Sequence, residues 1–449
     1  MALDNKVRTL METKVVVIDD DPTGSQTVHS CLLLTRWDPE TLEEALCDSA
    51  PLFFVLSNTR GMAAERAAAV TREICQNLRV ALDRLVAAGR SIQPLLVSRS
   101  DSTLRGHYPV ETDVIAAELG PFDAHFLVPA FFEGGRITRD SIHYVRQNGV
   151  EIPAHQTEFA RDSVFAFRHS YLPDYVAEKT RGRIAAGAVQ RFTLSDLRNG
   201  CLPRLLTLKE NTCVVVDAIE AADLVAFARD VRAAVKQGKR FLFRSAASLL
   251  TALADLPPQP VAAADMAQWT RGGKPGAVLV GSHVRKTTAQ LEYLLREPGV
   301  KSLEVNVDAC SGSAGSAQLK QLLEQARTAH GQGFDVVIFT SRSERQFADP
   351  LARLAFGEAI SAFLMALLRG LPEDLGFLIS KGGITSNDVL SSGLALRSAR
   401  VLGQILPGCS VVACPHDHPR FPDMPVVIFP GNVGDEESLA LARRRLRGH

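Results

Sequence analysis

The sequence predicts an α/β protein of two domains, each a mostly parallel β-sheet flanked by helices. Short apolar runs with the length of buried strands alternate with longer segments of helical periodicity, which is the pattern of βαβ units. Several of these runs end abruptly in a cluster of Asp, Ser, Thr, Arg or Gly. The chain has 449 residues, which is too long for one ordinary core. Because ligands of open α/β sheets bind beyond the carboxyl ends of the strands, these clusters are where function is expected.

The first half of the chain predicts one such sheet. Strands are expected at the apolar runs 14–18, 52–57, 94–98 and 125–128. An Ala-rich helix is expected from Ala63 to Gly89. Residues 134–175 break the alternation, are rich in Arg, His and Gly, and are interpreted as excursions over a ligand face. The βαβ pattern then resumes, with strands near 213–217 and 241–244.

Two Pro/Gly-rich stretches, 256–260 and 271–276, indicate a domain boundary. We therefore predict a first domain over residues 1–256 and a second over residues 272–449. Strands of the second domain are expected near 277–281, 302–307, 335–340, 376–380 and 426–429.

Composition excludes several classes of protein. The 50 basic and 50 acidic side chains cancel, so no global field attracts a polyanion such as nucleic acid. No run approaches the ~20 apolar residues of a membrane span, and no secretory signal is recognised, so a cytoplasmic protein without membrane contact is expected. The eight cysteines show no paired CxxC spacing, which signals neither a disulfide framework nor a zinc site.

The first polar cluster is the acidic run Asp19-Asp20-Asp21, directly after the first strand. Three carboxylates at a strand end repel one another unless a cation or a hydrogen-bonding ligand lies among them. A helix cap followed by Pro22 would account for one of the three, but not for all.

The second cluster is the loop from Ser98 to His107, which combines hydroxyls, the carboxylate of Asp101 and two guanidiniums. Arg99 or Arg105 could grip a substrate carboxylate with two hydrogen bonds, and Asp101 could accept a proton or a sugar hydroxyl. Arg60, at the end of a neighbouring strand, is a third candidate for the same anion. This density of groups favours a polyhydroxy acid over a capping box with solvent-facing arginines.

Three glycine-containing loops follow strands of the second half, whereas the P-loop and GxGxxG motifs are absent. Glycines at such places let backbone N–H groups point at phosphate oxygens. Each loop alone is a weak signal, since Gly is ordinary in such turns, but three in one domain favour a phosphate ligand. The loops are Gly281 to His283, Lys381 to Ser386, and Pro430 to Asp435, the last of which includes Asn432.

Together the motifs resemble the four-carbon acid sugar kinases, over nearly the whole chain. The motifs occur in the family's order: Asp20-Asp21-x-Thr23-Gly24, Asp101-Ser102-Thr103-Leu104-Arg105-Gly106, Gly281-Ser282, Gly382-Gly383-x-Thr385 and Gly431-Asn432-x-Gly434. Two departures, Pro22 within the first motif and Ser98-Arg99-Ser100 where a Lys is common, lie on the substrate side and leave the exact sugar acid open.

The resemblance implies an ATP-dependent enzyme that phosphorylates erythronate, threonate or 3-oxo-tetronate at the 4-hydroxyl, in a cleft between its two domains. It implies sugar-acid contacts from Asp20, Arg60, Ser100, Asp101, Ser102, Thr103 and Leu104. It implies ATP contacts from Ser282, Gly382, Gly383, Ile384, Thr385 and Gly431. Mg²⁺ is expected to bridge the phosphates, although no metal ligands are assigned, and a homodimer is left open.

Two carboxylates compete for the role of base, and we favour Asp101 as base with Asp20 as substrate ligand. Two other functions remain open. One is a non-catalytic two-domain sugar-acid binding protein, and the other is a metal-dependent aldolase or dehydratase that uses Asp19, Asp20 and Asp21. A pure binding protein would have no need of the glycine loops.

Overall fold

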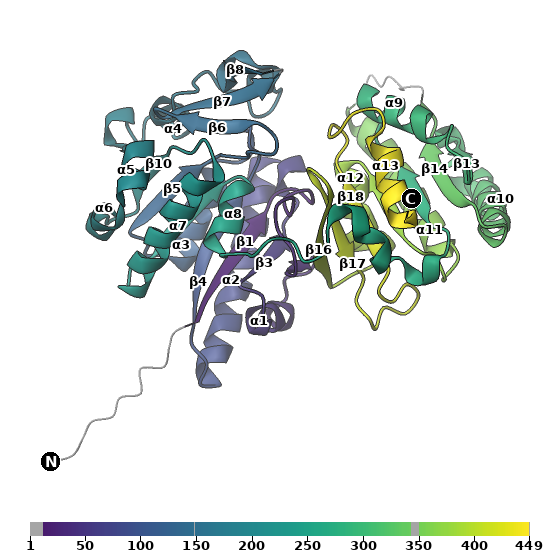
Figure 1. Cartoon of the computed structure of the whole chain (residues 1–449), viewed down its shortest axis with the longest axis horizontal. Helices are drawn as coiled ribbons and strands as arrows, with labels where there is room; N and C mark the ends of the chain where they lie inside the picture. Colours follow the sequence, from purple (N-terminus) through teal and green to yellow (C-terminus); the bar gives the residue numbers. More distant parts are fainter. Residues whose placement is uncertain (1–11, 148, 343–349, 449) are drawn as a thin grey trace. The chain divides into compact units, whose positions relative to one another are not determined.

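The computed structural model describes residues 12–147, 149–342 and 350–448 (Figure 1). The chain divides into two compact units, each an α/β fold: unit 1 comprises Met1–Asp20 and Trp37–Leu256, and unit 2 comprises Asp21–Arg36 and Pro257–His449. In the part of the chain that is described, no helix is long and apolar enough to cross a membrane.

Unit 1 contains a parallel sheet with the strand order β3-β1-β4-β11-β5-β10-β9. Its strands are β1 (Glu12–Asp19), β3 (Leu52–Leu56), β4 (Ile92–Arg99), β5 (Ala124–Val128), β9 (Gln190–Phe192), β10 (Thr212–Val216) and β11 (Phe241–Ser245). All residues of β3, β5 and β11 are buried, as expected for strands covered on both faces.

Right-handed crossovers explain how helices cover both faces of this sheet. The connections through α2 and α3 advance along the sheet from β3 to β4 and from β4 to β5, whereas α7 returns from β10 to β11. Crossovers of one hand that run in opposite directions lie on opposite faces. The helices of unit 1 are α1 (Pro39–Cys47), α2 (Ala64–Ala87), α3 (Val110–Leu119), α4 (Leu172–Lys179), α5 (Leu194–Asn199), α6 (Leu202–Thr207), α7 (Ala221–Lys236) and α8 (Ser248–Leu253).

The segment that breaks the sequence pattern, 134–175, forms a second, antiparallel sheet rather than irregular loops alone. This sheet consists of β6 (Arg136–Arg139), β7 (Ile142–Gln147) and β8 (Val150–Pro153). Its first hairpin is connected to the rest of unit 1 by a β-bridge between Thr138 and Ala218, the latter of which follows β10.

Unit 2 contains five parallel strands, in the order β13-β14-β12-β15-β18, continued by antiparallel β17, β16 and β2. The strands are β2 (Leu32–Leu34), β12 (Ala277–Val280), β13 (Val300–Val305), β14 (Asp335–Thr340), β15 (Leu378–Lys381), β16 (Ser398–Leu406), β17 (Cys409–Ala413) and β18 (Pro425–Phe429). The helices are α9 (Arg285–Leu294), α10 (Gly312–Gly331), α11 (Pro350–Gly370), α12 (Gly383–Asp388) and α13 (Ser438–Arg447).

One part of the predicted first domain lies elsewhere. The segment 21–36 groups with unit 2 although the prediction placed it within residues 1–256. The physical reason is that β2 pairs antiparallel with β16, and the Ser25 and Ser410 hydroxyls form a buried hydrogen bond of 3.0 Å. This strand exchange depends on partners almost 400 residues away in sequence, which no local pattern reveals.

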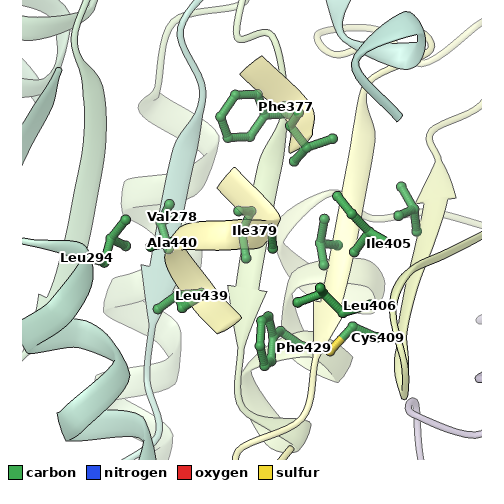
Figure 2. Packing of buried hydrophobic residues seen from close by; sticks show 14 of the residues in the cluster. Val278, Leu294, Phe377, Ile379, Ile405, Leu406, Cys409, Phe429, Leu439 and Ala440 are labelled. Carbon is green, nitrogen blue, oxygen red and sulfur yellow. The ribbon is translucent and has the colours of Figure 1, made fainter. Parts of the chain in front are cut away.

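The core of unit 2 lies between its sheet and α13. Figure 2 shows Leu439 and Ala440 of α13 against Val278 of β12 and Ile379 of β15, all of them buried. The helix is anchored beyond this apolar contact by a buried ion pair, in which Arg443 Nε donates to Asp335 Oδ2 at 2.6 Å. Asp335 is fully buried and also accepts the Gly276 N–H at 2.7 Å.

Asp335→Asn should destabilise unit 2 by about 3–5 kcal/mol, because it leaves the buried Arg443 charge with only the more distant carboxylate of Glu297, at 3.9 Å. The chain has two tryptophans, of which Trp269 belongs to unit 2 and ends a 3₁₀ helix that contacts α13. Urea unfolding followed by Trp269 fluorescence in a Trp37→Phe background therefore measures this unit. Glu373→Gln is the control, since Glu373 pairs with Arg420 on the surface and its loss should change little. An unchanged midpoint for Asp335→Asn would contradict the anchoring role.

Lys381, the last residue of β15, is fully buried, and burial lowers the pKa of its ammonium group to about 7. The unfolded chain keeps the proton up to a pH near the ordinary value of 10.5. The unfolded state therefore binds more protons between these two values, and stability should rise with pH across that window.

Lys381→Met should remove this dependence. Its stability relative to the parent should be greatest below pH 7 and should shrink steadily up to pH 10. The Trp269 unfolding assay in buffers from pH 6.5 to 10 measures the difference. A difference that does not change with pH would show that Lys381 does not titrate in this window.

Candidate functional site

A change in the direction of the chain connections places the motifs of unit 1 at one point of its sheet. Within this sheet the chain leaves β1 towards β3 on one side and leaves β4 towards β5 on the other. Where neighbouring strands diverge in this way, a crevice opens at their carboxyl ends. Asp20 follows β1 and Ser100 follows β4, so both predicted clusters lie at this switch point.

Asp20 is the centre of the site in unit 1, and its side chain is only 1% exposed. Arg60, in the 3₁₀ helix after β3, donates from Nη2 to Oδ1 at 2.5 Å and from Nε to Oδ2 at 3.2 Å. Ser100 Oγ donates to Oδ2 at 2.8 Å. The predicted residues Asp20, Arg60 and Ser100 are thus brought together, and Arg60 is engaged by a carboxylate of the protein itself.

A second ion pair extends this network. Arg244, at the end of β11, donates to Ser100 Oγ at 2.6 Å and to Glu111 Oε2 at 2.5 Å. Glu111 accepts in turn from Thr59 Oγ1 at 2.5 Å, and Thr59 is the neighbour of Arg60. The contacts close into a ring of two acidic and two basic side chains that ties together the ends of β1, β3, β4 and β11. A charge-assisted ring of this kind fixes the strand ends relative to one another.

Gly106 closes over this ring. Its φ is +114°, and a Cβ there would stand 2.4 Å from Ser100 Oγ and 2.7 Å from Arg244 Nη2. No other residue fits, because a side chain would displace the ring and the backbone conformation disfavours L residues.

Asp101 lies in the next turn and has a different environment. Its Oδ2 accepts from Arg105 Nε at 2.9 Å, from Thr103 N at 3.2 Å and from Thr103 Oγ1. Burial alone would raise the pKa of Asp101, but the charges of Arg60 and Arg105 and these hydrogen bonds outweigh it and hold the pKa below its ordinary value. Asp101 is therefore ionised at neutral pH, and its Oδ1 faces no hydrogen-bond donor among the described residues.

A small recess, partly open to solvent, lies beside this turn. Polar groups of the loop and of β11 form one part of its wall, and two stacked tyrosines, with ring centroids 6.0 Å apart, form another. It is lined by Ser100, Asp101, Leu104, Arg105, Tyr108, Leu127, Pro129, Tyr175, Arg244 and Ser245.

Side chains from other elements hold the loop that carries Asp101 by donating hydrogen bonds to its backbone carbonyls. His143 of β7 is fully buried and its Nε2 contacts the Ser102 carbonyl at 2.7 Å, while Tyr175 donates to the Leu104 carbonyl at 2.8 Å. Burial lowers the pKa of His143 to about 4, so the ring is neutral and Nε2 donates. The residues predicted as ligands at 102 and 104 thus contribute their backbone to the fold of the loop.

Unit 2 repeats the arrangement at the carboxyl ends of β12 and β15. The chain leaves β12 towards β13 and leaves β15 towards β18, in the opposite direction, so the two strand ends form a switch point. The three predicted glycine loops meet there. Gly281 N donates to the Lys381 carbonyl at 3.3 Å, and Gly382 N donates to the Phe429 carbonyl at 2.8 Å.

Side chains hold the third loop against the first two. Thr287 Oγ1 donates to the Gly431 carbonyl at 2.9 Å and lies 3.2 Å from Ser282 Oγ. The Lys381 ammonium donates to the Pro430 carbonyl at 2.5 Å. A Cβ at Gly281 would stand 2.2 Å from Thr385 Oγ1, so only glycine permits this approach of the loops.

The residues of unit 2 that were predicted to bind ATP differ in how far they are exposed to solvent. Ile384 is 80% exposed, and Asn432 is also exposed. Ser282, Gly383, Thr385 and Gly431 are partly buried, and Gly382 is buried.

The acidic run does not form one cluster. Asp20 belongs to the ring in unit 1, whereas Asp21 belongs to unit 2, where its Oδ2 lies 3.8 Å from the position of a Cβ on Gly383. Among the described residues, no group of three or more His, Cys, Asp and Glu side chains is placed to hold a metal ion. The geometry that an aldolase or dehydratase would require of Asp19, Asp20 and Asp21 is therefore not found.

Sequence reasoning missed Arg244, Glu111 and His143. Arg244 carried a signal, because it ends the apolar run that begins at Phe241 and a charge there is unusual. Glu111 and His143 lie in a helix and in a sheet that the loop motifs do not include, and no spacing connects them to the site.

Two family models match the chain, one after the other. A family model described as a sugar-binding N-terminal domain matches residues 15–253, and one described as a nucleotide-binding C-terminal domain matches residues 277–439.

Two curated relatives are similar to part of the chain. The D-threonate kinase of Bordetella bronchiseptica is 29% identical over 223 residues, which is 48% of this chain and 49% of that protein. The D-erythronate kinase of Heliobacterium modesticaldum is 29% identical over 219 residues, which is 47% of this chain and 46% of that protein. The chain therefore spans about half the length of the curated relatives it matches.

Solved structures share the fold over nearly the whole chain. A protein of Salmonella typhimurium LT2 gives a TM-score of 0.69 at 19% identity and covers 97% of this chain and 99% of its own. A Haemophilus influenzae protein gives 0.64 at 18% identity, covering 96% and 100%. Since the sugar-binding model alone matches more than half of the residues and the nucleotide-binding model follows it in order, the chain belongs to the four-carbon acid sugar kinase family.

Proposed function

We propose that the protein is an ATP-dependent kinase that phosphorylates a four-carbon sugar acid, of the erythronate, threonate or 3-oxo-tetronate class, at its 4-hydroxyl. The observation that carries this proposal is that each unit has its own motif loops at its own switch point. The loops of unit 1 offer charged and hydroxyl groups, and those of unit 2 offer glycine backbone.

The site in unit 1 suits a small polyhydroxy acid. The lining of the recess includes the guanidiniums of Arg105 and Arg244 and the carboxylate of Asp101, which offer donors and an acceptor to the hydroxyls of a ligand. We assign acid binding to this unit. Asp20, Arg60 and Ser100 form the rigid framework beneath the site, and the turn from Asp101 to Arg105 contacts the acid.

The loops of unit 2 suit the phosphates of ATP. Gly383 is open on its exposed side, since a Cβ there would meet only Asp21 Oδ2 within 4 Å. Phosphate oxygens could therefore approach the backbone N–H groups of the loop closely. We assign nucleotide binding to Ser282, Gly382 to Thr385, Gly431 and Asn432. Mg²⁺ enters with the nucleotide, and the Asp21 carboxylate is close to that loop, with Oδ2 3.8 Å from the position of a Cβ on Gly383.

In this proposal Asp101 accepts the proton of the attacking hydroxyl. Asp101 lines the recess, and its lowered pKa keeps it ionised, so it orients the hydroxyl and takes the proton as the bond to phosphorus forms. A weakly basic carboxylate suffices because phosphoryl transfer has a loose transition state with little early demand on the nucleophile. Asp20 has both oxygens engaged and acts as a positioning residue.

A screen of four-carbon sugar acids with MgATP tests the proposal. Incubation with each of D-erythronate, L-erythronate, D-threonate and L-threonate should yield ADP and a phosphomonoester that ³¹P NMR detects for at least one acid. Binding of an acid without phosphoester formation would favour the non-catalytic sugar-acid binding protein.

Asp101→Asn should lower kcat far more than it changes the Kd of the acid, because it keeps shape and most hydrogen bonds but removes the proton acceptor. The expected loss of rate is ~10²-fold or more, towards the lower end for a general base in view of the loose transition state. Steady-state kinetics and calorimetric titration separate the two effects.

The matched control for this variant is Asp162→Asn, which removes the other carboxylate beside Arg105, at 3.4 Å, and should leave kcat within a few-fold. Equal losses in the two variants would show that the charge on Arg105, rather than a proton acceptor, is what matters.

Gly383→Val should abolish nucleotide binding by filling the space in front of the loop, while acid binding persists. Because no atom of the described protein lies within 3.4 Å of the new Cβ, the fold should survive. Titration with a non-hydrolysable ATP analogue and, separately, with the acid measures both. Retained nucleotide affinity would remove the loop from the proposed site.

A further inference from the structure

Arg136, outside every motif of the sequence, contacts the same aromatic ring as Arg105, which lines the recess in unit 1. It is the first residue of β6, and its backbone pairs with Phe131 through hydrogen bonds of 2.8 and 2.9 Å. Phe131 lies two residues beyond Pro129, which lines the recess. The antiparallel sheet of 134–175 therefore delivers this arginine to the end of β5.

The guanidinium of Arg136 shares an aromatic ring with a residue of the recess. Its Cζ lies 5.8 Å from the centroid of Phe159, and Arg105 Cζ lies 5.1 Å from the same centroid. Contact with the ring holds a guanidinium in place without neutralising it. The two cations are thus kept near each other and near Asp101, whose charge acts on both.

Arg99, at the end of β4, is 4% exposed, donates from Nη1 to the Ser100 carbonyl and has an unpartnered Nε, but it does not line the recess. Three other arginines of the site have carboxylate partners. Arg60 pairs with Asp20, Arg244 with Glu111, and Arg105 with both Asp101 and Asp162.

Arg136 differs from them in its charge balance. Among the described residues no carboxylate oxygen lies within 4.0 Å of its guanidinium, which donates from Nη1 to the Gly134 carbonyl. Its Nε is buried and has no hydrogen-bond partner. Burial lowers the pKa of Arg136, which reflects the poor solvation of its charge. Arg136 as a whole is partly buried, and a poorly solvated cation without a counter-ion is stabilised when a ligand supplies one.

We propose that Arg136 binds the carboxylate of the sugar acid, with the Phe159 ring fixing the plane of the guanidinium. This inference rests on the proposed function, and it names which cation of the site recognises the acid group. A guanidinium matches a carboxylate through two parallel hydrogen bonds, and the unpartnered Nε supplies one of the two donors. The acid is then oriented by its charged end at Arg136, so that its hydroxyls extend towards Asp101.

The test is calorimetric titration of the full chain with D-erythronate and D-threonate. Arg136→Met should raise the Kd of the acid that the parent binds by about ten- to a hundredfold, which is the loss of a charge-assisted contact. Arg139→Met is the matched control, because Arg139 ends the same strand and pairs with Glu151 at 2.6 Å instead. This control should keep the affinity of the parent.

The outcomes separate this inference from the proposed function. If the parent chain binds neither acid, the proposed function fails together with the inference. If the parent binds an acid and Arg136→Met binds it equally well, only the role of Arg136 is overturned. Should Arg136→Met fail to fold by its thermal midpoint, Arg136→Lys decides, since it keeps the charge but not the planar fork. A several-fold weaker acid affinity at an unchanged midpoint supports the proposal, and parental affinity overturns it.

Discussion

The buried carboxylate of Asp20 is the constraint on which the site in unit 1 depends. A carboxylate that is 1% exposed is stable only if hydrogen bonds or a counter-ion compensate its charge, and here Arg60 and Ser100 donate to it. Ser100 is in turn fixed by Arg244, whose second partner is Glu111. Four strand ends are thereby locked, and the turn that carries Asp101 begins from a rigid base. The recess therefore has a shape set by charge compensation rather than by apolar packing alone.

Unit 2 reaches a similar result by other means. Its three loops approach through backbone hydrogen bonds and through the absence of a side chain at Gly281. The buried Lys381 side chain, between these loops, donates to the Pro430 carbonyl, and its Nζ lies 4.1 Å from the centroid of the Phe429 ring. A frame of this kind offers N–H groups and little fixed charge, which suits the phosphates of a nucleotide that arrives with its own cation.

The sequence predicted those parts of the fold that local patterns determine. The buried strands β1, β3, β4 and β5 were expected within two residues of their ends, and the loops after β12, β15 and β18 meet as the glycine pattern suggested. The β16 and β17 hairpin and the sheet of β6 to β8 were not recognised, although their strands pair with immediate neighbours in the chain. The position of segment 21–36 escaped prediction because β2 pairs with β16, which is distant in sequence. The sequence named Arg60, Arg99 and Arg105 as candidates for binding the acid and did not name Arg136, because counting arginines does not reveal which of them already has a carboxylate partner.

The central claim is that acid and nucleotide bind to different units, and hydrogen exchange of the full chain tests it most directly. Addition of the bound sugar acid should slow exchange in residues 57–62 and 98–108 of unit 1. Addition of a non-hydrolysable MgATP analogue should slow exchange in residues 281–285, 381–387 and 430–434 of unit 2. Protection of the unit 1 segments by the nucleotide alone, or of the unit 2 segments by the acid alone, would contradict the account.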